Sequence, residues 1–239
     1  MTAAYTNHAC NGNAMRSFIG DMMVMRATRD IKKGEEILMP YRLPSVDHEV
    51  TQAELKKIWG FECDCSLCIA EQKTSRDQRQ QRARLAGEMT TLLSANPVSD
   101  TQAPNDKKIA QIKKRLGGIE STYDKQAFDN RPRLALVAPG LWLCQAYHRK
   151  GQWNDVDKLA LAVLRDLGFV VIITEDKIVI QRDYCHLIDE AIRASMFAIR
   201  AYQKLERANP AKQMEAFAKE LYGTLNGTMR GFDEGYIES

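Results

Sequence analysis

The sequence predicts an α+β protein in which α-helices dominate. Strand signals are concentrated in the first 50 residues, where apolar runs at residues 22–27 and 36–39 are bounded by turn-forming residues. Further along the chain, apolar residues recur at three- and four-residue spacing, which is typical of packed helices. We therefore expect three parts: a β-rich part with a metal site over residues 1–70, a polar helix and linker over 71–106, and an α-helical domain over 107–239.

The composition is that of an ordinary globular protein. Of the 239 residues, 27% are charged and 44% are hydrophobic, which is enough apolar material for a sizeable core. The formal net charge of +3 gives no support for a dedicated nucleic-acid binder. The sequence shows neither a membrane-spanning apolar run nor the layout of a signal peptide. We expect an intracellular protein, in the nucleus, the cytoplasm or both, that binds neither nucleic acid nor membrane directly.

The segment from Thr51 to Trp59 has the pattern of a helix. Thr51 can cap its first turn together with Glu54, three residues later, as in a capping box. Gly60 is expected to end the helix. The expected apolar face consists of Leu55, Ile58 and Trp59.

The remainder of the chain is expected to be helical apart from one loop. Residues 71–84 are strongly polar and predict a solvated helix that links two parts. Residues 94–106 contain Pro97 and Pro104 among small polar residues and predict a loop. Further helices are expected at residues 134–149, 153–167, 182–208 and 210–225.

The first two of these later helices show a hint of repetition. The apolar and aromatic positions of residues 141–147 and 151–164 are similar to one helix–turn–helix unit of the tetratricopeptide type. An ordinary antiparallel helical hairpin gives much the same pattern. If such units stack, they form a concave surface, so we expect the helical domain to contact a protein substrate or protein partner.

Three cysteines in six residues indicate a metal site rather than disulfides in a reducing compartment. Cys63, Cys65 and Cys68 have a C-x-C-x-x-C spacing, at which three thiolates can converge on one Zn²⁺. A closed structural site needs a fourth ligand. Cys10 is the best candidate, and His8 and His48 are the alternatives. The alternative interpretation is that the clustered cysteines are small buried core residues without a metal. We expect such a core role for Cys144 and Cys185.

Three short motifs, in order, resemble those of SET-domain protein lysine methyltransferases. Residues 7–13 (NHACNGN) resemble the N-H-S-C-x-x-N motif, residues 34–41 (GEEILMPY) the G-E-E segment, and residues 59–68 (WGFECDCSLC) the post-SET end. Their order and separation are similar to those of the SET-and-MYND (SMYD) branch and of fungal SET proteins with helical, tetratricopeptide-like C-terminal regions. The resemblance covers roughly residues 5–70 and extends only weakly into the helical part.

The resemblance implies a partial SET β-fold with a post-SET zinc site, and an S-adenosyl-L-methionine (AdoMet)-dependent protein-lysine N-methyltransferase. By this resemblance, Asn7 and His8 bind the cofactor and Phe61 stacks on its adenine. Tyr41 corresponds to the catalytic tyrosine whose hydroxyl faces the reacting centre. The implied zinc ligands are Cys10, Cys63, Cys65 and Cys68.

The sequence also departs from the family pattern. The Gly-x-Gly segment that binds the methionine end of AdoMet has no counterpart here, Ala9 replaces a serine, and Trp59 stands where many relatives have a second channel tyrosine. Three interpretations follow. The chain is a truncated methyltransferase that is inactive in isolation, a catalytically dead zinc-stabilised helical interaction module, or an unrelated zinc-ribbon adaptor.

Overall fold

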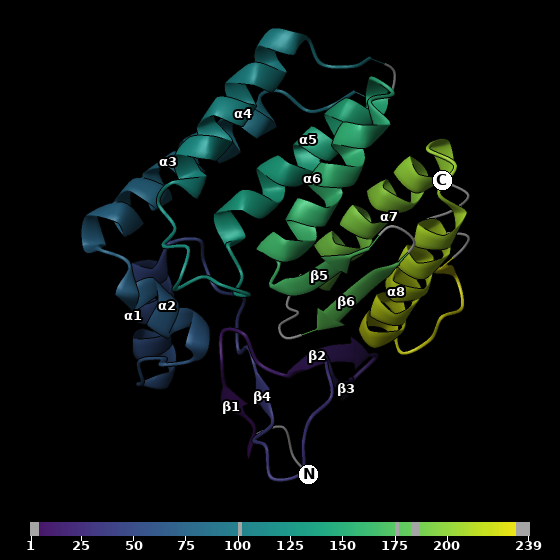
Figure 1. Cartoon of the computed structure of the whole chain (residues 1–239). Coiled ribbons are helices and arrows are strands. Elements are labelled where there is room, and N and C mark those ends of the chain that lie inside the picture. Colours follow the sequence, from purple (N-terminus) through teal and green to yellow (C-terminus); the bar gives the residue numbers. More distant parts are fainter. Residues whose placement is uncertain (1–4, 100–101, 175–176, 183–186, 233–239) are drawn as a thin grey trace.

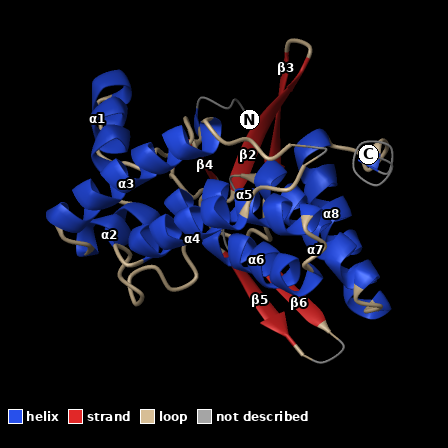
Figure 2. Cartoon of the chain, turned by 90° about the horizontal axis from the view of Figure 1, so that it is seen from above, coloured by secondary structure: helices blue, strands red, loops and turns tan. Residues whose placement is uncertain are grey.

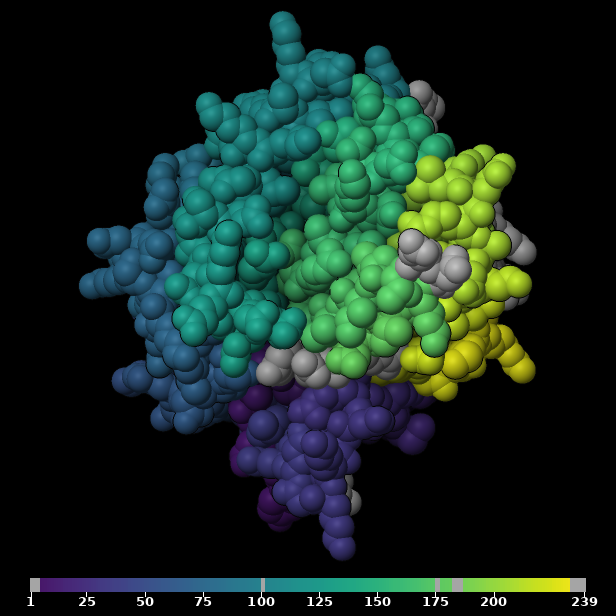
Figure 3. All heavy atoms as spheres, in the orientation of Figure 1, coloured from purple at the N-terminus to yellow at the C-terminus, as the bar shows by residue number. Residues whose placement is uncertain are grey.

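A computed structural model describes residues 5–99, 102–174, 177–182 and 187–232 of the chain. The short strands of the N-terminal part lie below a body of helices, and the space-filling view shows the same division (Figures 1 and 3). The described residues thus form an α+β fold that is mostly helical, as predicted. The predicted domain boundaries at residues 70 and 106 remain a prediction.

Four strands come from the first 40 residues. They are β1 (Asn7–His8), β2 (Ala14–Ile19), β3 (Met22–Ala27) and β4 (Leu38–Met39). β1 pairs with β4 in parallel, and β2 pairs with β3 as an antiparallel hairpin. The two predicted apolar runs are therefore strands, although the second is shorter than its run.

The described helices are α1 (His48–Trp59), α2 (Ser66–Lys73), α3 (Arg76–Ser94), α4 (Asp106–Glu120), α5 (Val137–Arg149), α6 (Trp153–Asp166), α7 (Ile188–Lys204) and α8 (Ala208–Asn226). A short 3-10 turn, Leu134–Leu136, leads into α5. The helices predicted at residues 134–149, 153–167 and 210–225 agree with these bounds. Residues 95–99 and 102–105 of the predicted loop belong to no helix or strand, and its residues 100–101 lie outside the described residues. None of the described helices combines the length and the hydropathy needed to cross a bilayer.

The start of α1 differs from the expectation. Asp47 is the N-cap residue, and its side chain accepts a hydrogen bond from the Glu49 amide at 3.0 Å. Thr51 lies inside the helix, where its hydroxyl oxygen accepts from the Ser45 amide at 2.9 Å. The capping box was therefore wrong, because an aspartate four residues earlier supplies a good cap. Gly60 does end the helix, in the left-handed conformation with φ 79°.

The predicted apolar face of α1 is only partly buried. Leu55 is fully buried, whereas Ile58 and Trp59 are 59% and 41% exposed. The prediction used only the three- and four-residue spacing of these side chains, which puts all three on one face of the helix. The structure instead turns the last turn of the helix toward solvent, beside the aromatic side chains described below.

The polar segment at residues 71–84 is not one solvated helix. It is divided between α2 and α3, and the Ser75 side chain caps α3 by accepting from the Gln78 amide. Arg82 is only 1% exposed, and its guanidinium pairs with the carboxylate of Glu71. A charged sequence can therefore include a buried pair, because each ion is compensated by the other.

A β-hairpin inside the helical part was not predicted. β5 (Phe169–Ile173) and β6 (Ile178–Arg182) pair in antiparallel register between α6 and α7. Gly168, with φ 93°, follows α6. The β-branched residues 170–173 that come after it favour a strand. In Figure 2 this hairpin and the β2–β3 hairpin extend from opposite sides of the helices.

Because of this hairpin, the predicted start of the next helix was wrong. α7 begins at Ile188 rather than at residue 182, which belongs to β6. Cys185 lies outside the described residues.

Two groups of buried side chains form the core. One joins α6, α7 and α8 to the hairpin, with Phe169 edge-on to Phe217 at 5.4 Å between ring centroids. The other includes Cys10, Cys63 and Cys68 together with apolar residues of α3, α4 and α5. The cysteine-rich part is therefore packed directly against the helical domain. Cys144 is buried in the first group, as predicted for a core cysteine.

Candidate functional site

Three of the clustered cysteines lie at the junction of α1 and α2. Cys63 follows the left-handed Gly60, Cys65 is the N-cap residue of α2, and Cys68 lies in the first turn of that helix. The side chain of Gln52 in α1 fixes this loop, because it donates to the Cys63 carbonyl and accepts from the Cys63 amide, both at 2.8 Å. The backbone between the two helices is thus held in one conformation.

Cys10 reaches these residues on the loop that follows β1. A Cβ at Gly12 would lie 2.2 Å from the Leu38 carbonyl oxygen, so only glycine allows the loop to approach β4 this closely. Asn11 donates to the Ser66 hydroxyl of α2 at 2.7 Å. Together these contacts bring a residue that lies 53 positions before Cys63 against α2.

The four sulfur atoms form a compact group. The Sγ atoms of Cys10, Cys63, Cys65 and Cys68 all lie within 4.8 Å of one another. The Cys10 sulfur is 3.9 Å from that of Cys63 and 3.6 Å from that of Cys68. A tetrahedral zinc thiolate site with Zn–S bonds of about 2.3 Å has sulfur–sulfur separations of about 3.8 Å. The geometry fits a zinc ion at the centre of the four cysteines.

The electrostatics of this group also favour a cation. Hydrogen bonds, first from Cys10 and then from Cys65 and Cys68, lower the pKa of the Cys63 thiol. The pKa of Cys10 is raised, first by its hydrogen bond to Cys63, and the pKa of Cys68 is raised, first by its hydrogen bond to Cys10. Four sulfurs at this distance therefore cannot all be thiolates unless a positive ion lies between them.

His8 connects the cysteines to an aromatic cluster. Its Nδ1 accepts a hydrogen bond from the Tyr41 amide at 3.0 Å, so the proton of a neutral ring lies on Nε2. Nε2 is 3.3 Å from the Cys10 sulfur and donates to it. A hydrogen bond of this kind orients a metal-bound thiolate from outside the coordination shell.

The aromatic cluster consists of His8, Tyr41, Trp59 and Phe61. The His8 ring centroid lies 5.2 Å from that of Tyr41 and 5.7 Å from that of Phe61. The Tyr41 and Trp59 centroids are 5.4 Å apart. The Tyr41 hydroxyl donates to the Thr6 carbonyl at 2.8 Å, which fixes its direction. These rings form an apolar wall directly beside the four cysteines.

Asn7 is on the same strand as His8 but has a different partner. Its amide donates to the Glu36 carboxylate at 2.7 Å. Asn13, the last residue of the same motif, donates to Glu35 and to the Glu36 carbonyl and accepts from the Leu38 amide. The first two motifs are thus joined to each other by hydrogen bonds.

The structure brings together most of the predicted site residues. The four cysteines form one group, and His8, Tyr41 and Phe61 lie beside it, whereas the Asn7 side chain faces Glu36. His48, an alternative metal ligand, is buried but does not belong to the group of possible ligands. Gln52 was missed as a supporting residue because its partner Cys63 is distant in sequence and no local pattern identifies it. Asn13 belongs to the first motif, but its contacts with Glu35, Glu36 and Leu38 were not predicted.

Comparison with known proteins agrees with this geometry. The family model described as "SET domain" matches residues 2–42. This segment belongs to the SET-domain family. The chain is 38% identical over 116 residues to a protein named "Methyltransferase" from Gibberella zeae. It is 33% identical over 75 residues to "Histone-lysine N-methyltransferase SET5" of Yarrowia lipolytica and 36% identical over 67 residues to "Histone-lysine N-methyltransferase SMYD3" of Homo sapiens.

The SET-domain similarity is limited in extent. The three matches include 48%, 30% and 28% of this chain, and the chain covers 16%, 17% and 16% of the respective relatives. The relatives support a lysine methyltransferase family, in agreement with the resemblance of the motifs.

Proposed function

We propose that this chain forms the cofactor-facing, zinc-containing part of an AdoMet-dependent protein-lysine N-methyltransferase. One observation supports this most strongly: His8 is hydrogen-bonded to Tyr41 on one side and to Cys10 on the other. Zinc bound by Cys10, Cys63, Cys65 and Cys68 would hold the Phe61 loop against the Asn7–His8 strand. In this proposal Asn7, His8 and Phe61 bind the cofactor, and Tyr41 acts in catalysis.

The geometry suits the chemistry of methyl transfer to an amine. AdoMet, when bound, supplies an activated methyl group. A lysine amine has a reference pKa of about 10.4 and must lose its proton before it attacks. The rings of Tyr41, Trp59 and Phe61 exclude water from one side of such a site. Because the Tyr41 hydroxyl donates to the Thr6 carbonyl, its oxygen keeps lone pairs that can accept a hydrogen bond from the amine.

We further propose that the isolated chain does not catalyse the reaction efficiently. Its sequence lacks a Gly-x-Gly segment before the first motif, and the Asn7 amide is held by Glu36. The described cysteines are free thiols, which fits a reducing compartment such as the nucleus or the cytoplasm. The partner expected at the helical domain is a protein, either the substrate or a second factor.

A second candidate function is a catalytically dead, zinc-stabilised interaction module. The observation that favours it is the large helical part, which has its own buried core around α6, α7 and α8. This candidate predicts zinc binding without AdoMet binding. The first candidate predicts both.

Calorimetric titration of AdoMet into the zinc-loaded chain separates the two candidates. We expect saturable binding that is lost in Phe61→Ala and weakened in His8→Ala. Phe18→Ala is a matched control, because Phe18 is 65% exposed on β2 and contributes to no described ring pair. Zinc is quantified on each sample. No heat of binding with one zinc per chain would favour the interaction module.

A further inference from the structure

The positive charge of the chain is concentrated on one helix. The formal net charge of +3 predicted no dedicated nucleic-acid binder, but this total does not show how the charges are distributed. α4 alone contains five lysine and arginine side chains and two carboxylates, so its own formal charge is +3. The other residues of the chain are therefore neutral as a whole. No residue of α4 belongs to the four-cysteine group or to the His8–Tyr41 cluster.

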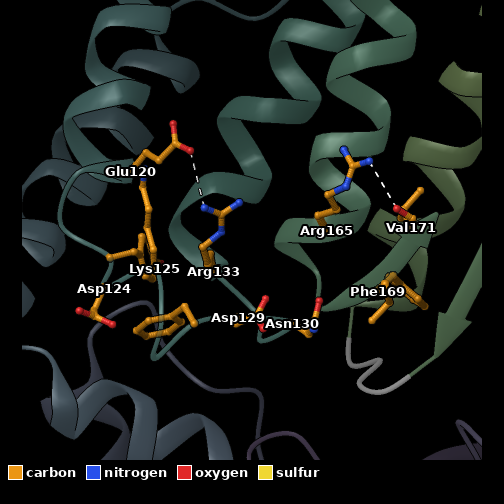
Figure 4. A pocket seen from close by; sticks show the side chains of 12 residues that line it. Glu120, Asp124, Lys125, Asp129, Asn130, Arg133, Arg165, Phe169 and Val171 are labelled. Carbon is orange, nitrogen blue, oxygen red and sulfur yellow. Dashed lines mark hydrogen bonds and ion pairs between the residues drawn. The ribbon is translucent and has the colours of Figure 1, made fainter. Parts of the chain in front are cut away.

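Both carboxylates of α4 already have cationic partners outside the helix. Asp106, in the first turn, pairs with Lys150 at the end of α5. Glu120, the last residue of the helix, pairs with Arg133 at 3.6 Å (Figure 4). Neither carboxylate is therefore free to balance the lysines of α4.

Four lysines of α4 have no ion-pair partner in the part of the chain that the structure describes. All four are exposed, and they are Lys107, Lys108, Lys113 and Lys114. The fifth cation, Arg115, pairs with Glu88 of α3 at 2.8 Å. α3 and α5 pack against α4, but α5 contains no carboxylate and α3 contains none after Glu88. The neighbouring helices thus leave the charge of the four lysines unbalanced.

The lysines lie on the open side of the helix. Its apolar side is buried against α3 and α5 and consists of Ile109, Ile112 and Ile119. Figure 1 shows α4 on the outside of the helical body, beside α3. Lys107 and Lys114 are seven residues apart, so they share one side of the helix and are separated by about 10 Å along its axis. They form a line of charge that faces solvent.

The other two lysines lie on opposite flanks of this line. Lys113 extends toward α5, where its ammonium is 5.8 Å from the centre of the Tyr147 ring. Lys108 is five residues earlier, which places it about 140° around the helix. The surface between the flanks includes the small residues Ala110 and Gly117, and a Cβ at Gly117 would meet nothing within 4 Å. A large partner can therefore approach α4 closely between the two flanks.

We propose that α4 binds the phosphate backbone of double-stranded DNA and lies along the major groove, with Lys108 and Lys113 toward the two strands. A lysine ammonium is a compact charge that suits phosphates, whereas carboxylates are matched by the planar fork of arginine. The major groove of B-form DNA is about 12 Å wide and admits a helix, but that of A-form RNA is too narrow.

A membrane surface fits this helix less well than DNA. An interfacial helix buries its apolar side in the lipid, and the apolar side of α4 is already buried in the core of the protein. Contacts to phosphates carry no sequence information. The proposed surface therefore anchors the chain on DNA of any sequence, and it does not depend on methyl transfer.

The test uses fluorescence anisotropy of the full, zinc-loaded chain with a labelled DNA duplex of mixed sequence. Four phosphate contacts predict that log K falls with log salt with a slope of about −3.6. We therefore expect the affinity to fall by about 10²-fold between about 50 and 200 mM salt. A second duplex of unrelated sequence should bind with the same affinity and slope.

Two double variants assign the binding to α4. Lys113→Gln/Lys114→Gln should weaken binding at low salt by at least about tenfold and reduce the slope by about two, since each phosphate contact contributes about one. Both positions are exposed and glutamine is a good helix former, so the variant is expected to fold. Lys33→Gln/Lys212→Gln removes two exposed lysines outside α4 and is the matched control, which should bind as the parent does.

Several results would overturn the proposal. They are no binding of the duplex at low salt, a parent-like affinity and slope for Lys113→Gln/Lys114→Gln, and an equal loss in Lys33→Gln/Lys212→Gln. Polyglutamate and an RNA duplex of the same length serve as competitors. Either of them competing as well as unlabelled DNA would assign the surface to an acidic protein or to RNA, and would contradict the choice of DNA.

Discussion

The guanidinium of Arg82 lies over the ring of Tyr123, with its Cζ atom 4.0 Å from the ring centroid. The same guanidinium pairs with the carboxylate of Glu71 and donates to the Thr122 carbonyl. Glu71 lies on α2, one turn after Cys68. A buried arginine thus joins the helix that holds the candidate metal ligands to the segment that leads from α4 toward α5.

Removal of this arginine is expected to destabilise the protein strongly. Arg82→Met leaves the buried Glu71 carboxylate without its cation, and breaking a buried ion pair typically costs about 3–5 kcal/mol. The free energy of unfolding from urea titration measures this change. Arg84→Met on the same helix is the control, because its exposed pair with Glu88 contributes less than about 1 kcal/mol. A cost for Arg82→Met no larger than that of the control would contradict this role.

A second prediction concerns the close approach at Gly12. Gly12→Ala places a Cβ 2.2 Å from the Leu38 carbonyl oxygen, so β4 must move away from the loop that carries Cys10. We expect the variant to lose stability and to retain less zinc after dialysis. Gly87→Ala is the opposite case, because nothing lies within 4 Å of a Cβ on this helical residue. Helix propensity predicts that Gly87→Ala gains about 0.5–1 kcal/mol. Equal stability of the two variants would show that the close approach has no energetic consequence.

The zinc site makes a third prediction, which concerns folding. A structural zinc site contributes on the order of 10 kcal/mol of apparent binding energy, comparable with a whole domain's stability of about 5–15 kcal/mol. We expect a strong chelator, or Cys65→Ser, to unfold residues 1–70 while helices of the C-terminal part persist by circular dichroism. Cys144→Ser, a buried cysteine outside the four, should retain one zinc per chain. A near-native exchange pattern of amide protons in residues 1–70 after chelation would contradict this prediction.

A fourth prediction follows from Asp166, a buried carboxyl at the end of α6. Burial raises its pKa from an ordinary value of 3.8 to about 7, although Arg133 lies 2.6 Å away and opposes the shift. The folded state therefore binds a proton that the unfolded state releases at lower pH. The resulting stabilisation is complete below pH 3.8 and is lost as the pH rises toward 7 and above.

Asp166→Asn removes this titration. As the pH rises from 4 to 8, the free energy of unfolding of the parent protein should fall by about 1–4 kcal/mol relative to that of Asp166→Asn. One pKa unit corresponds to about 1.4 kcal/mol. The thiols and any bound zinc contribute the same pH dependence to both proteins, so their contribution cancels when the two free energies are subtracted. A difference that is constant over this pH range would show that the pKa of Asp166 is not raised.

Local spacing and residue type predicted Cys63, Cys65 and Cys68 as metal ligands, and the resemblance of the motifs implied Cys10 as the fourth. Four sulfurs do lie within 4.8 Å of one another, including the distant one of Cys10. The contacts of Gln52 with Cys63, and those of the motif residue Asn13 with Glu35, Glu36 and Leu38, depend instead on the tertiary fold, which brings segments distant in sequence together. The cap of α1 was misassigned because Thr51 and Asp47 are both good capping residues, and the geometry of the preceding loop selects Asp47.

The β5–β6 hairpin shows a different limit of sequence analysis. A short continuous apolar run does not distinguish a buried strand from a helix segment. Residues 169–173 follow a well-formed helix and precede another, so helical periodicity on either side obscured them. The β-branched composition and Gly168 were the available signals.

The central claim is that Cys10 closes a four-sulfur metal site and thereby holds His8 against Tyr41. X-ray absorption at the zinc edge, on the full chain and on Cys10→Ser, tests it most directly. We expect four sulfur neighbours at about 2.3 Å in the parent protein and three in the variant. A nitrogen neighbour in the parent, or an unchanged sulfur shell in Cys10→Ser, would contradict it.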